Sequence, residues 1–526
     1  MARLATGIGS ICGVVAASTA AEMSAGIRAA LRETPAIELR LDWLASDVER
    51  SKLLVWLRRH RPAKAIFLAT CRRKGAGGRF AGDIQAQLFW LIQARDAGCQ
   101  WCDIEIETLR ELPNRSARGY AIPSHIMLSI HDFDRTPDLG RSVRMPTHGE
   151  IDTIKIAARA RTIADSVRLL RWASGSKDCV AVPMGEAGLP ARILALKYGS
   201  TLEYAPIGAA TAPGQVSLHD LKHLYRADKL NRSTRVFGVI GNPIAHSLSP
   251  LLHNSAFAAK NVNAVYLPFL VEKLPDFLKA IPAFEIRGFS VTIPHKQAIL
   301  KHLKHCDDLA ADIGAVNTVV VRADGSLFGS NTDYVGVLRS LDKKLRLAKS
   351  RVLIFGAGGA ARAAAFALAR AGASVAVCAR RENAARELAG AIGGESLPRR
   401  ALRSESFDAI LNTTPVGMHP RTKISPLTAD ELNCRIVMDL IYRPEQTQLL
   451  QLAARQGIAT VSGVEMFLAQ GIAQWELWTK QRAPEAVMRR AILKALRGEN
   501  SASPSRAKSA HGKTNPAKST TKRDAR

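Results

Sequence analysis

A glycine-rich segment of the sequence has the spacing of a phosphate-binding turn. Gly356, Gly358 and Ala361 occupy the three positions of a GxGxxA pattern. The first glycine permits a tight turn, the second lets backbone N–H groups approach a pyrophosphate, and the small third residue lets a helix pack closely on a strand. The apolar run RVLIF precedes the pattern and an alanine-rich run follows it, which predicts a βαβ dinucleotide-binding unit. Its predicted cofactor-binding residues are Gly356, Ala357, Gly358, Gly359 and Ala360.

Two arginines follow the second predicted strand of this unit. Arg380 and Arg381 come directly after VAVCA, where an NAD enzyme usually places an acidic residue for the ribose hydroxyls. Guanidinium groups suit a 2′-phosphate instead, so we predict NADP (NADPH) as the cofactor and both arginines as part of its site. The alternative is that both arginines are merely solvated.

A lysine interrupts an apolar run in the first half of the chain. Lys155 stands between Ile154 and Ile156 in DTIKIAA, which otherwise reads as a buried β-strand. Because side chains alternate along a strand, the two isoleucines are expected to face a helical layer and Lys155 the opposite side. We therefore predict that Lys155 is an amine held inside a site, where it can act as a nucleophile.

The elements around Lys155 predict a barrel. Short apolar or β-branched runs alternate with stretches of helical periodicity over the first 225 or so residues, which favours a (β/α)₈ (TIM) barrel with its active site at the C-terminal ends of the strands. The predicted strands are 11–17, 36–42, 63–70, 102–107, 125–131, 152–158, 179–184 and 201–207.

The pattern changes after a polar, basic connection near residues 219–235. A second αβ unit is predicted to begin at VFGVIGNPI, and GFSVTIPHK gives a further strand and turn. GAVNTVVV and LFGSNTD are expected to pair as a hairpin before the dinucleotide-binding unit begins. The predicted fold class is therefore α/β throughout, with a barrel followed by a two-domain unit that ends in a Rossmann-type domain.

The first half resembles type I 3-dehydroquinate dehydratase, from residue 11 to about 225. The resemblance rests on ELRLD, ATCRRKGAGG, SIHDF, DTIKIA, MGEAGLPAR and ATAPGQVS. It implies that Lys155 forms a Schiff base with the ketone of 3-dehydroquinate and that His131 transfers protons for loss of water. The chemistry agrees, because a protonated imine is a better electron sink than a carbonyl and an imidazole titrates near neutrality. Taken alone, His131 could instead cap or pack at a strand end.

The same resemblance implies a set of substrate-binding residues in the barrel: Glu38, Arg40, Arg72, Arg192, Thr211 and Gln215. An arginine fork suits the carboxylate of a polyhydroxylated ring. The alternative for Glu38 and Arg40 is a buried ion pair inside the barrel. Two positions depart from the family: Thr211 stands where Ser is common, and Ala76 stands where many members carry Glu before the paired glycines. Any relay that this Glu provides must be absent here or supplied by another group.

The second half resembles the shikimate dehydrogenase family, from about residue 235 to 496. The motifs, in order, are GNPIAHSLSP, GFSVTIPHK, GAVNT, GSNTD, GAGGAAR, NTTPVGM, DLIY and GVEMFLAQ. The resemblance implies that Lys296 and Asp333 are the catalytic pair, and a lysine oriented by a carboxylate suits proton donation to a ketone that receives hydride. It implies substrate contacts from Ser247, Ser249, Thr292, Asn317, Tyr442 and Gln470.

Each member of the catalytic pair also has a plain alternative. Lys296 could be an exposed turn lysine and Asp333 a helix cap. Ser290 departs from the family, since many members have Asn before VT, and the shorter side chain is expected to rearrange contacts with the ring hydroxyls.

Composition sets limits on the remaining possibilities. The 526 residues are 47% hydrophobic with a formal net charge of +28, which suits anionic substrates as well as polyanions. Residues 498–526 read as a disordered basic tail.

The eight cysteines are scattered, and Cys99 and Cys102 have CxxC spacing without further ligand pairs, so we predict free thiols, a cytoplasmic protein and no metal. No apolar run is long enough for a membrane span, and the N-terminus reads as a first strand rather than a signal peptide.

Together the two resemblances predict a bifunctional enzyme that dehydrates 3-dehydroquinate to 3-dehydroshikimate and reduces that product to shikimate with NADPH. One alternative is a quinate-oxidising version that runs in catabolism, although Ser247 and Ser249 favour shikimate. A second is a non-catalytic sensor of shikimate metabolites with its tail on nucleic acid, which the retained catalytic residues disfavour. The expected domains are the dehydratase (1–228), the substrate-binding domain (235–340), the NADP-binding domain (341–462), the returning C-terminal helices (463–497) and the tail (498–526).

Overall fold

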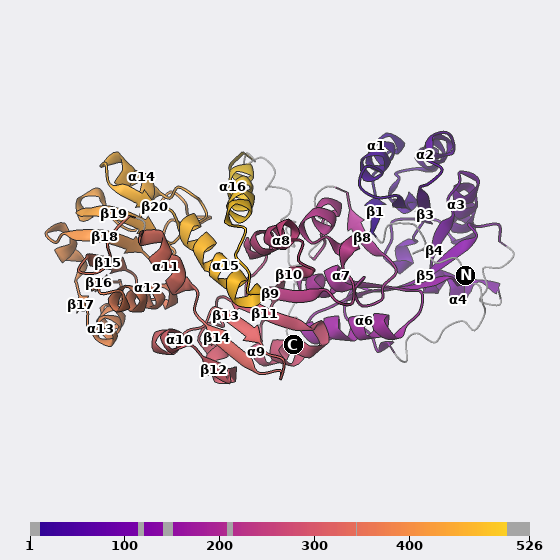
Figure 1. Ribbon diagram of the computed structural model, residues 1–526. Helices are drawn as coiled ribbons and strands as arrows, with labels where there is room; N and C mark the ends of the chain where they lie inside the picture. The colour runs from indigo at the N-terminus through magenta and orange to yellow at the C-terminus, as the bar shows by residue number, and fades with distance from the viewer. Residues whose placement is uncertain (1–10, 114–119, 140–150, 208–213, 343, 502–526) are drawn as a thin grey trace, which may run out of the picture.

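The computed structural model describes residues 11–113, 120–139, 151–207, 214–342 and 344–501. It contains three sheets along the chain, with helices between the strands, and Figure 1 shows them in sequence order across the molecule. The N-terminal barrel lies at one end, the Rossmann-type sheet lies at the other, and the second sheet lies between them (Figure 1).

The first sheet has eight strands in the order β7-β6-β5-β4-β3-β2-β1-β8, and all its pairings are parallel. A bridge between Cys179 and Ser200 joins its two ends, so the barrel is nearly closed. The eight predicted strands are thereby confirmed. Their bounds are β1 (Ile11–Val15), β2 (Ala36–Arg40), β3 (Ile66–Thr70), β4 (Trp101–Glu105), β5 (His125–Asp132), β6 (Thr153–Arg159), β7 (Cys179–Met184) and β8 (Glu203–Pro206).

Helices cover the outside of the barrel, and several begin at side chains that satisfy free backbone N–H groups. Thr19 and Glu22 form a capping box at α1, and Thr162 and Asp165 form another at α6. The helices and short helical turns are α1 (Ala20–Ala30), η1 (Leu41–Trp43), α2 (Asp47–His60), η2 (Lys74–Ala76), α3 (Ile84–Asp96), α4 (Ile106–Glu111), α6 (Ile163–Gly175), η4 (Glu186–Gly188) and α7 (Leu189–Leu194).

Strand β6 shows the predicted alternation. Ile154 and Ile156 pack against Leu169 and Trp172 of α6, on the outside of the barrel. Ala157 belongs to the apolar cluster inside the barrel, and Lys155 is buried on that inner face. The isoleucines therefore anchor the strand to its helix while the lysine faces the interior.

The second sheet is mixed, with the order β10-β9-β11-β13-β14-β12. Strands β13 and β14 pair antiparallel, which confirms the predicted hairpin. The elements are η5 (Asp220–Leu224), η6 (Ala227–Lys229), β9 (Arg235–Gly241), α8 (Ser249–Ala259), β10 (Ala264–Leu270), α9 (Leu274–Phe284), β11 (Ile286–Val291), η7 (Ala298–His302), β12 (His305–Cys306), α10 (Asp308–Ile313), β13 (Thr318–Val321) and β14 (Leu327–Ser330).

The third sheet is parallel throughout, in the order β17-β16-β15-β18-β19-β20, and it confirms the predicted Rossmann-type unit. Its elements are α11 (Asp333–Leu341), β15 (Arg351–Phe355), α12 (Gly359–Arg370), β16 (Ser374–Cys378), α13 (Glu382–Ala391), β17 (Glu395–Ser396), η8 (Arg399–Arg403), β18 (Phe407–Asn412), η9 (Ala429–Glu431), β19 (Cys434–Asp439), α14 (Gln448–Arg455) and β20 (Ala459–Val461).

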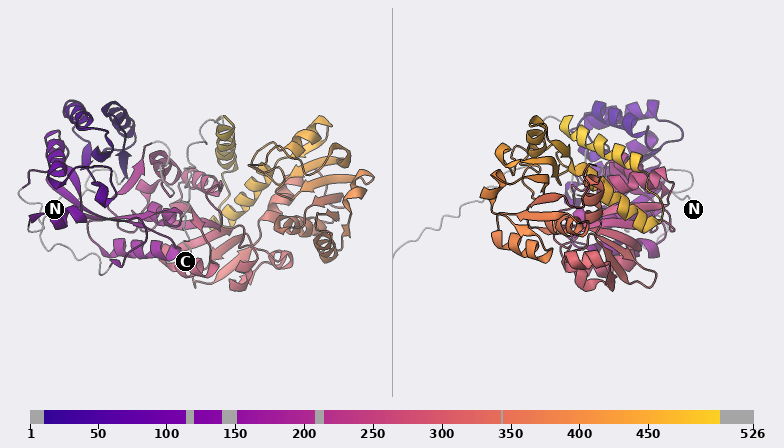
Figure 2. Two further views of the ribbon diagram at one scale, coloured as in Figure 1. Left: turned by 180° about the vertical axis from the view of Figure 1, so that it is seen from behind. Right: turned by 60° about the vertical axis from the view of Figure 1, so that its left-hand side comes forward.

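Two C-terminal helices return from the third sheet to the second. Helix α15 (Gly463–Thr479) packs along α11 and places Trp475 in the apolar cluster of the second sheet. Helix α16 (Glu485–Ser501) packs on α8. Both helices are visible in yellow between the two sheets in Figure 2. Residues 498–501, expected in the tail, are the end of α16, and residues 502–526 lie outside the described part of the chain.

Two further expectations concern membranes and thiols. Among the described residues, no helix has both the length and the apolar character needed to span a bilayer. All eight cysteines are free thiols, and both members of the CxxC pair, Cys99 and Cys102, are buried in the outer core of the barrel. Burial raises the pKa of Cys99 to about 12, so its thiol is inert rather than reactive.

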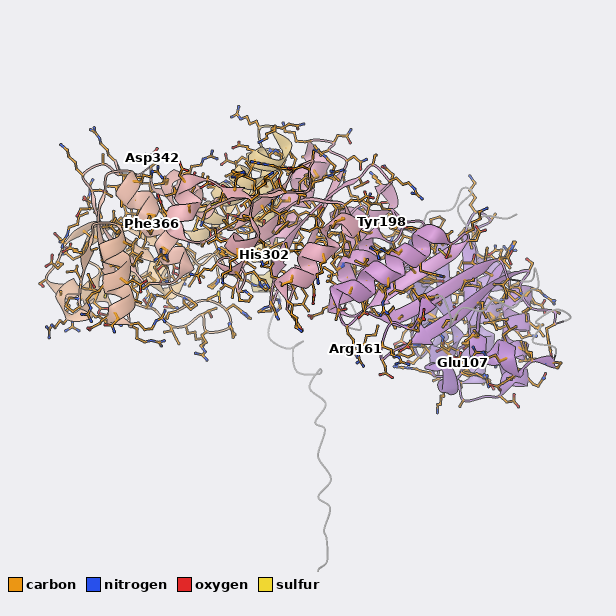
Figure 3. All side chains as sticks on the ribbon, turned by 90° about the horizontal axis from the view of Figure 1, so that it is seen from below. Glu107, Arg161, Tyr198, His302, Asp342 and Phe366 are labelled. Carbon is orange, nitrogen blue, oxygen red and sulfur yellow. The ribbon has the colours of Figure 1, made fainter. Side chains whose placement is uncertain are left out.

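The barrel and the second sheet share one apolar cluster. It joins α6 and α7 of the barrel, for example Val167 and Ile193, to Val265 and Phe277 of the second sheet and its helix α9. At its margin, the fully buried Lys197 donates to Glu285 over 2.7 Å and to the main-chain oxygen of Arg232 over 2.8 Å. Tyr198 lies at this junction in Figure 3, well away from Glu107.

We expect Lys197→Met to weaken the junction by about 1–3 kcal/mol, because it removes two hydrogen bonds from a buried position and leaves the Arg232 carbonyl unpaired. Calorimetric unfolding measures the loss. Lys52→Met, which removes an exposed ion pair with Glu49, is the matched control and is expected to change stability by less than about 1 kcal/mol. Equal effects of the two substitutions would contradict this role of Lys197.

Candidate active sites

Lys155 lies on the inner face of the barrel, as the third residue of β6, and its charge is neutralised there by nearby carboxylates. Its ammonium donates a hydrogen bond to Oδ2 of Asp103 on β4, and Oε1 of Glu38 on β2 is 3.9 Å away. The ring of Tyr204 on β8 lies beneath it, 4.7 Å from the ammonium to the ring centroid. Three strands thus converge on a single amine.

Asp103 was not among the predicted site residues, yet its carboxylate links Lys155, Ser129 and Arg72. Besides Lys155, it accepts a hydrogen bond of 2.6 Å from Ser129 and lies 3.6 Å from the guanidinium of Arg72. Burial alone would raise its pKa, but Lys155 and Arg72 hold that pKa well below the usual range. The sequence did contain a pattern that indicates Asp103. Asp103 and Glu105 are two residues apart in CDIEIE, as Glu38 and Arg40 are in ELRLD. Since side chains alternate along a strand, each pair lies on one face, here the barrel interior.

His131 is the penultimate residue of the neighbouring strand β5, two residues beyond Ser129, which pairs in register with Lys155. Its pKa lies well below 6.5, first because the ring is buried and then because Arg72 and Lys155 carry positive charge nearby. The imidazole is therefore neutral at pH 7 and can accept a proton. Its buried Nδ1 has no hydrogen-bond partner among the described residues.

The loop that departs from the family pattern lies over His131. Phe133 stacks on the imidazole, with 5.9 Å between the ring centroids, and Gly77 faces Phe133 so closely that a Cβ there would lie 2.4 Å from the ring. Gly77 also adopts φ of +77°, so glycine is required twice over. Ala76, which directly precedes it, brings no polar group to this loop, in line with the unpartnered Nδ1 of His131 among the described residues.

The alternative interpretation of Glu38 and Arg40, a buried ion pair with each other, does not occur in the described part of the chain. Arg40 forms a two-pronged ion pair with Asp42 at 2.9 and 2.8 Å. Glu38 instead accepts from Thr70 at 2.7 Å and faces Lys155. The strand alternation places Glu38 and Arg40 on one face, but the turn after β2 brings Asp42 closer to the guanidinium. Glu38 therefore belongs to the group around the lysine.

The remaining predicted barrel residues are Arg72, Arg192, Gln215 and Thr211, and they do not share one environment. Arg72 is buried between Asp103 and Glu105. Its Nε lies 4.0 Å from Oε1 of Glu105 and has no hydrogen-bond partner among the described residues. Arg192 is buried elsewhere: it donates to Glu203 and to the main-chain oxygen of Tyr204, each over 2.8 Å. The guanidinium group of Arg192 is therefore already hydrogen-bonded within the protein. Gln215 is half-buried after Gly214, whereas Thr211 lies outside the described residues.

A cavity of about 480 Å³ lies between the second and third sheets. It brings together residues from β9, β11, the hairpin, α11 and α15, and these include all eight residues predicted for the second site. They are Ser247, Ser249, Thr292, Lys296, Asn317, Asp333, Tyr442 and Gln470. The apolar side chains of Val239, Ile244 and Met466 also line it.

Lys296 and Asp333 form the charged pair of this cavity. The ammonium donates to Oδ2 of Asp333 over 2.6 Å, and the amide of Asn317 donates to Oδ1 over 2.8 Å. Asp333 is the first residue of α11, where the helix dipole favours a carboxylate. The side chain of Lys296 remains 26% exposed, so its ammonium can reach a molecule in the cavity.

Ser290 lies in the cavity wall, but its hydroxyl is engaged by the protein. It is 2.6 Å from the hydroxyl of Tyr266 and donates to Oε1 of Gln474 over 3.0 Å. Gln474 in turn donates to Thr318 over 3.1 Å. Tyr266 and Gln474 were not predicted, and no local motif marks them. Tyr266 reaches Ser290 from β10 of the same sheet, and Gln474 reaches it from α15.

The glycine-rich segment adopts the conformation that a pyrophosphate requires. Gly356 has φ of +130°, and a Cβ there would lie 2.4 Å from Oγ1 of Thr413, so only glycine fits. At Gly358 and Gly359, at the start of α12, a Cβ would meet no described atom within 4 Å, so that side of the turn is open. Ala361 is fully buried against the sheet. The residues fit a dinucleotide phosphate at this helix N-terminus.

Arg380 and Arg381 lie between β16 and α13, beside this turn. Both side chains are exposed. Within the described ranges neither forms an ion pair, unlike Arg351 and Arg399 of the same sheet, which hold carboxylates at 2.6–2.7 Å. Their guanidinium groups therefore remain available to an anion.

Comparison with known proteins agrees with this division of the chain. Residues 11–232 match the family model of type I 3-dehydroquinase. Residues 239–319 match the shikimate dehydrogenase substrate binding domain, and residues 463–493 match the shikimate 5′-dehydrogenase C-terminal domain.

Two relatives cover different lengths of the chain. The bifunctional 3-dehydroquinate dehydratase/shikimate dehydrogenase, chloroplastic, of Arabidopsis thaliana is 35% identical over 85% of this chain and 78% of its own length. The shikimate dehydrogenase (NADP(+)) of Moorella thermoacetica is 45% identical over 52% of this chain and 98% of its own. The solved shikimate 5-dehydrogenase of Thermus thermophilus, in complex with NADP(H) and shikimate, is 37% identical over 50% of this chain and 100% of its own, with a TM-score of 0.47.

We expect the imidazole of His131 to titrate below pH 6.5 in the folded protein, because burial and the charges of Arg72 and Lys155 all oppose its protonation. An NMR pH titration, with the signal assigned by its loss in His131→Gln, measures this pKa. Arg72→Met is expected to raise it toward the ordinary value. A pKa at or above 6.5 in the wild-type protein would overturn this account of the site.

Proposed function

The chain belongs to the family of bifunctional 3-dehydroquinate dehydratase/shikimate dehydrogenase enzymes, and from that premise we propose that Lys155 and His131 dehydrate 3-dehydroquinate through a Schiff base. The observation that carries this proposal is the position of Lys155, enclosed beside Asp103 on the inner face of the barrel and near a neutral histidine.

The steps balance with the residues present. The Lys155 ammonium first passes one proton to neutral His131, and the resulting amine attacks the substrate ketone. His131 returns that proton as the ketone oxygen leaves as water, so both protons of this water come from the Lys155 nitrogen and an iminium ion remains. His131 takes the proton next to the iminium carbon, and the hydroxyl one carbon further leaves as water with a proton returned by the imidazole. Water then hydrolyses the imine, which releases 3-dehydroshikimate and restores Lys155. No redox partner is required.

The surrounding charges serve different parts of this sequence. Asp103 stays ionised throughout, so it stabilises each cationic form of the Lys155 nitrogen. Neutral His131 has a lone pair available at pH 7. Arg72, whose Nε has no hydrogen-bond partner in the described part of the chain, is our proposed contact for the substrate carboxylate. We propose that Glu38, Arg40, Thr211 and Gln215 contact the ring hydroxyls. Arg192 can bind the substrate carboxylate only if its guanidinium group releases Glu203 or contacts Glu203 and the substrate at the same time.

The second site is proposed to reduce 3-dehydroshikimate to shikimate. Bound NADPH supplies the hydride for the ketone carbon. Lys296 donates the proton to the developing alkoxide and is recharged through Asp333, which Asn317 holds in place. Ser247, Ser249, Thr292, Tyr442 and Gln470 line the cavity and are proposed to hold the carboxylate and hydroxyls of the ring.

NADP is the proposed cofactor because of the open turn at Gly358 and the two arginines that form no ion pair within the described ranges. The backbone at Gly356–Ala360 would hold the pyrophosphate, while Arg380 and Arg381 would hold the 2′-phosphate. The Moorella relative is named for NADP(+), in agreement with this assignment. We also infer a reducing compartment such as the cytoplasm, since all eight thiols are free.

We propose the domain bounds given by the sequence, with one adjustment. The barrel spans 1–228, the substrate domain 235–340 and the NADP domain 341–462. The returning helices begin at 463 and extend to Ser501, the end of α16.

The alternative substrate of the reductase site is quinate, which differs by one ring hydroxyl. The hydroxyl of Ser290, which stands where many relatives have asparagine, is engaged by Tyr266 and Gln474, so it does not by itself select between the two rings. Steady-state rates with shikimate and quinate decide between the two substrates.

We expect Lys155→Ala and Lys296→Ala to abolish different halves of the reaction. Lys155→Ala should remove the dehydratase activity and the borohydride-trapped adduct, yet retain NADPH-dependent reduction of 3-dehydroshikimate. Lys296→Ala should slow that reduction by about 10²–10⁴-fold and leave the dehydratase intact. The assay supplies 3-dehydroquinate and NADPH together and measures both 3-dehydroshikimate and shikimate. A trapped adduct that persists in Lys155→Ala would reject the Schiff-base assignment.

We expect Arg380→Glu to raise the KM for NADPH by about 10–100-fold, which corresponds to the loss of one or two charge-assisted hydrogen bonds. The KM for NADH should change little or fall, because NADH lacks the 2′-phosphate. Arg386→Ala, on the exposed side of the adjoining helix α13, is the matched control and should leave both values unchanged. A parallel rise for both cofactors would argue against recognition of the 2′-phosphate.

A further inference from the structure

A group of three potential metal ligands lies at the end of the barrel opposite Lys155. Glu33 precedes β2, so it lies at the N-terminal ends of the strands, whereas catalytic residues of such barrels lie at the C-terminal ends. His219 and His223 come after β8, four residues apart in a helical segment, which places both imidazoles on one face. The spacing is visible in the sequence as HDLKH, although no metal was expected from it.

The three side chains already converge. Nε2 of His223 is 3.0 Å from Oε2 of Glu33, and Nδ1 of His219 is 3.9 Å from Oε1. One nitrogen of each imidazole and one carboxylate oxygen all lie within 4.8 Å of one another. A tetrahedral zinc ion with bonds of about 2.0–2.2 Å places its ligand atoms about 3.4 Å apart. Small side-chain rotations are enough to reach that geometry, and all three side chains are at least partly exposed.

We propose that Glu33, His219 and His223 form a binding site for a divalent first-row transition metal ion, with Zn²⁺ as the representative. Two imidazole nitrogens and one carboxylate suit such an ion, and water completes the coordination. The site does not depend on the proposed catalytic roles, because it lies at the other end of the barrel.

The main chain that carries these ligands is held independently of a metal. The hydroxyl of Thr34 donates to the main-chain oxygen of Ile11 over 2.5 Å, and Lys222 donates to the main-chain oxygen of Glu33. Leu218 and Leu221 are buried in the apolar cluster, which fixes the segment between the histidines.

The position of the site gives the ion a structural consequence. Glu33 belongs to the turn between α1 and β2, while the histidines belong to the segment that follows β8, and β8 closes the barrel against β1. A bound ion therefore crosslinks the first and last parts of the barrel. Because the ligands do not converge in the unfolded chain, binding favours the folded state.

The test uses the full-length protein, stripped with a chelator and exchanged into metal-free buffer. Zn²⁺ alone is titrated in competition with a chromophoric chelator, and thermal unfolding is recorded with and without Zn²⁺. The ligand variants are Glu33→Gln, His219→Ala and His223→Ala. The control is His60→Ala, which removes another exposed histidine, on α2.

We expect the wild type and the control to bind one more equivalent of Zn²⁺ than the three ligand variants and to gain thermal stability that those variants do not gain. Dehydratase and reductase activities in metal-free buffer should be the same in all five proteins, which shows that each is folded. Equal Zn²⁺ stoichiometry in the wild type and the His219→Ala and His223→Ala variants would overturn the proposal, as would equal thermal shifts.

Discussion

The barrel interior depends on the neutralisation of a single buried carboxylate. Asp103 lies between Lys155 and Arg72 and also accepts from Ser129, so one residue of β4 holds groups from three other places in the barrel. An unpaired charge in such a place costs several kcal/mol, and removal of either partner leaves the other without compensation. The inner face can therefore carry an amine only because β4, two strands away from β6 in the barrel, supplies its counter-charge. Neutral His131 completes a group in which charge is balanced before a substrate arrives.

The second site also contains an ion pair between a lysine and a carboxylate, but this pair is more exposed to solvent. Lys296 and Asp333 are closer to the solvent than Lys155 and Asp103, and their support comes from Asn317 and a helix N-terminus rather than from enclosure. The difference fits the two proposed tasks. An amine that forms a covalent bond benefits from a dry, fixed position, whereas a proton donor must be recharged from water in every turnover.

Most of the fold was predictable because its signals are local. Strand alternation placed Lys155 inside the barrel, and the glycine at 356 indicated a turn that only glycine fits. The second site was also largely predictable, since its residues sit in motifs that the cavity gathers. The interactions that were not predicted depend on tertiary packing. They are the ion pairs of Lys155 with Asp103, of Arg40 with Asp42 and of Arg192 with Glu203, and the hydrogen bonds that link Tyr266, Ser290 and Gln474. A sequence indicates the face on which a side chain lies, but not which of several neighbours reaches it.

The apolar cluster shared by the barrel and the second sheet has a consequence for how the chain can be divided. Val167 and Ile193 of the barrel are covered by Val265 and Phe277, which belong to the other half. A fragment that ended at the basic connection would present this face to water, and exposed apolar faces of that kind promote self-association. Each half therefore acts as a solubilising cover for the other. Separation of the two activities into independent polypeptides, in evolution or in the laboratory, requires polar replacements at this face and not only a cut in the linker.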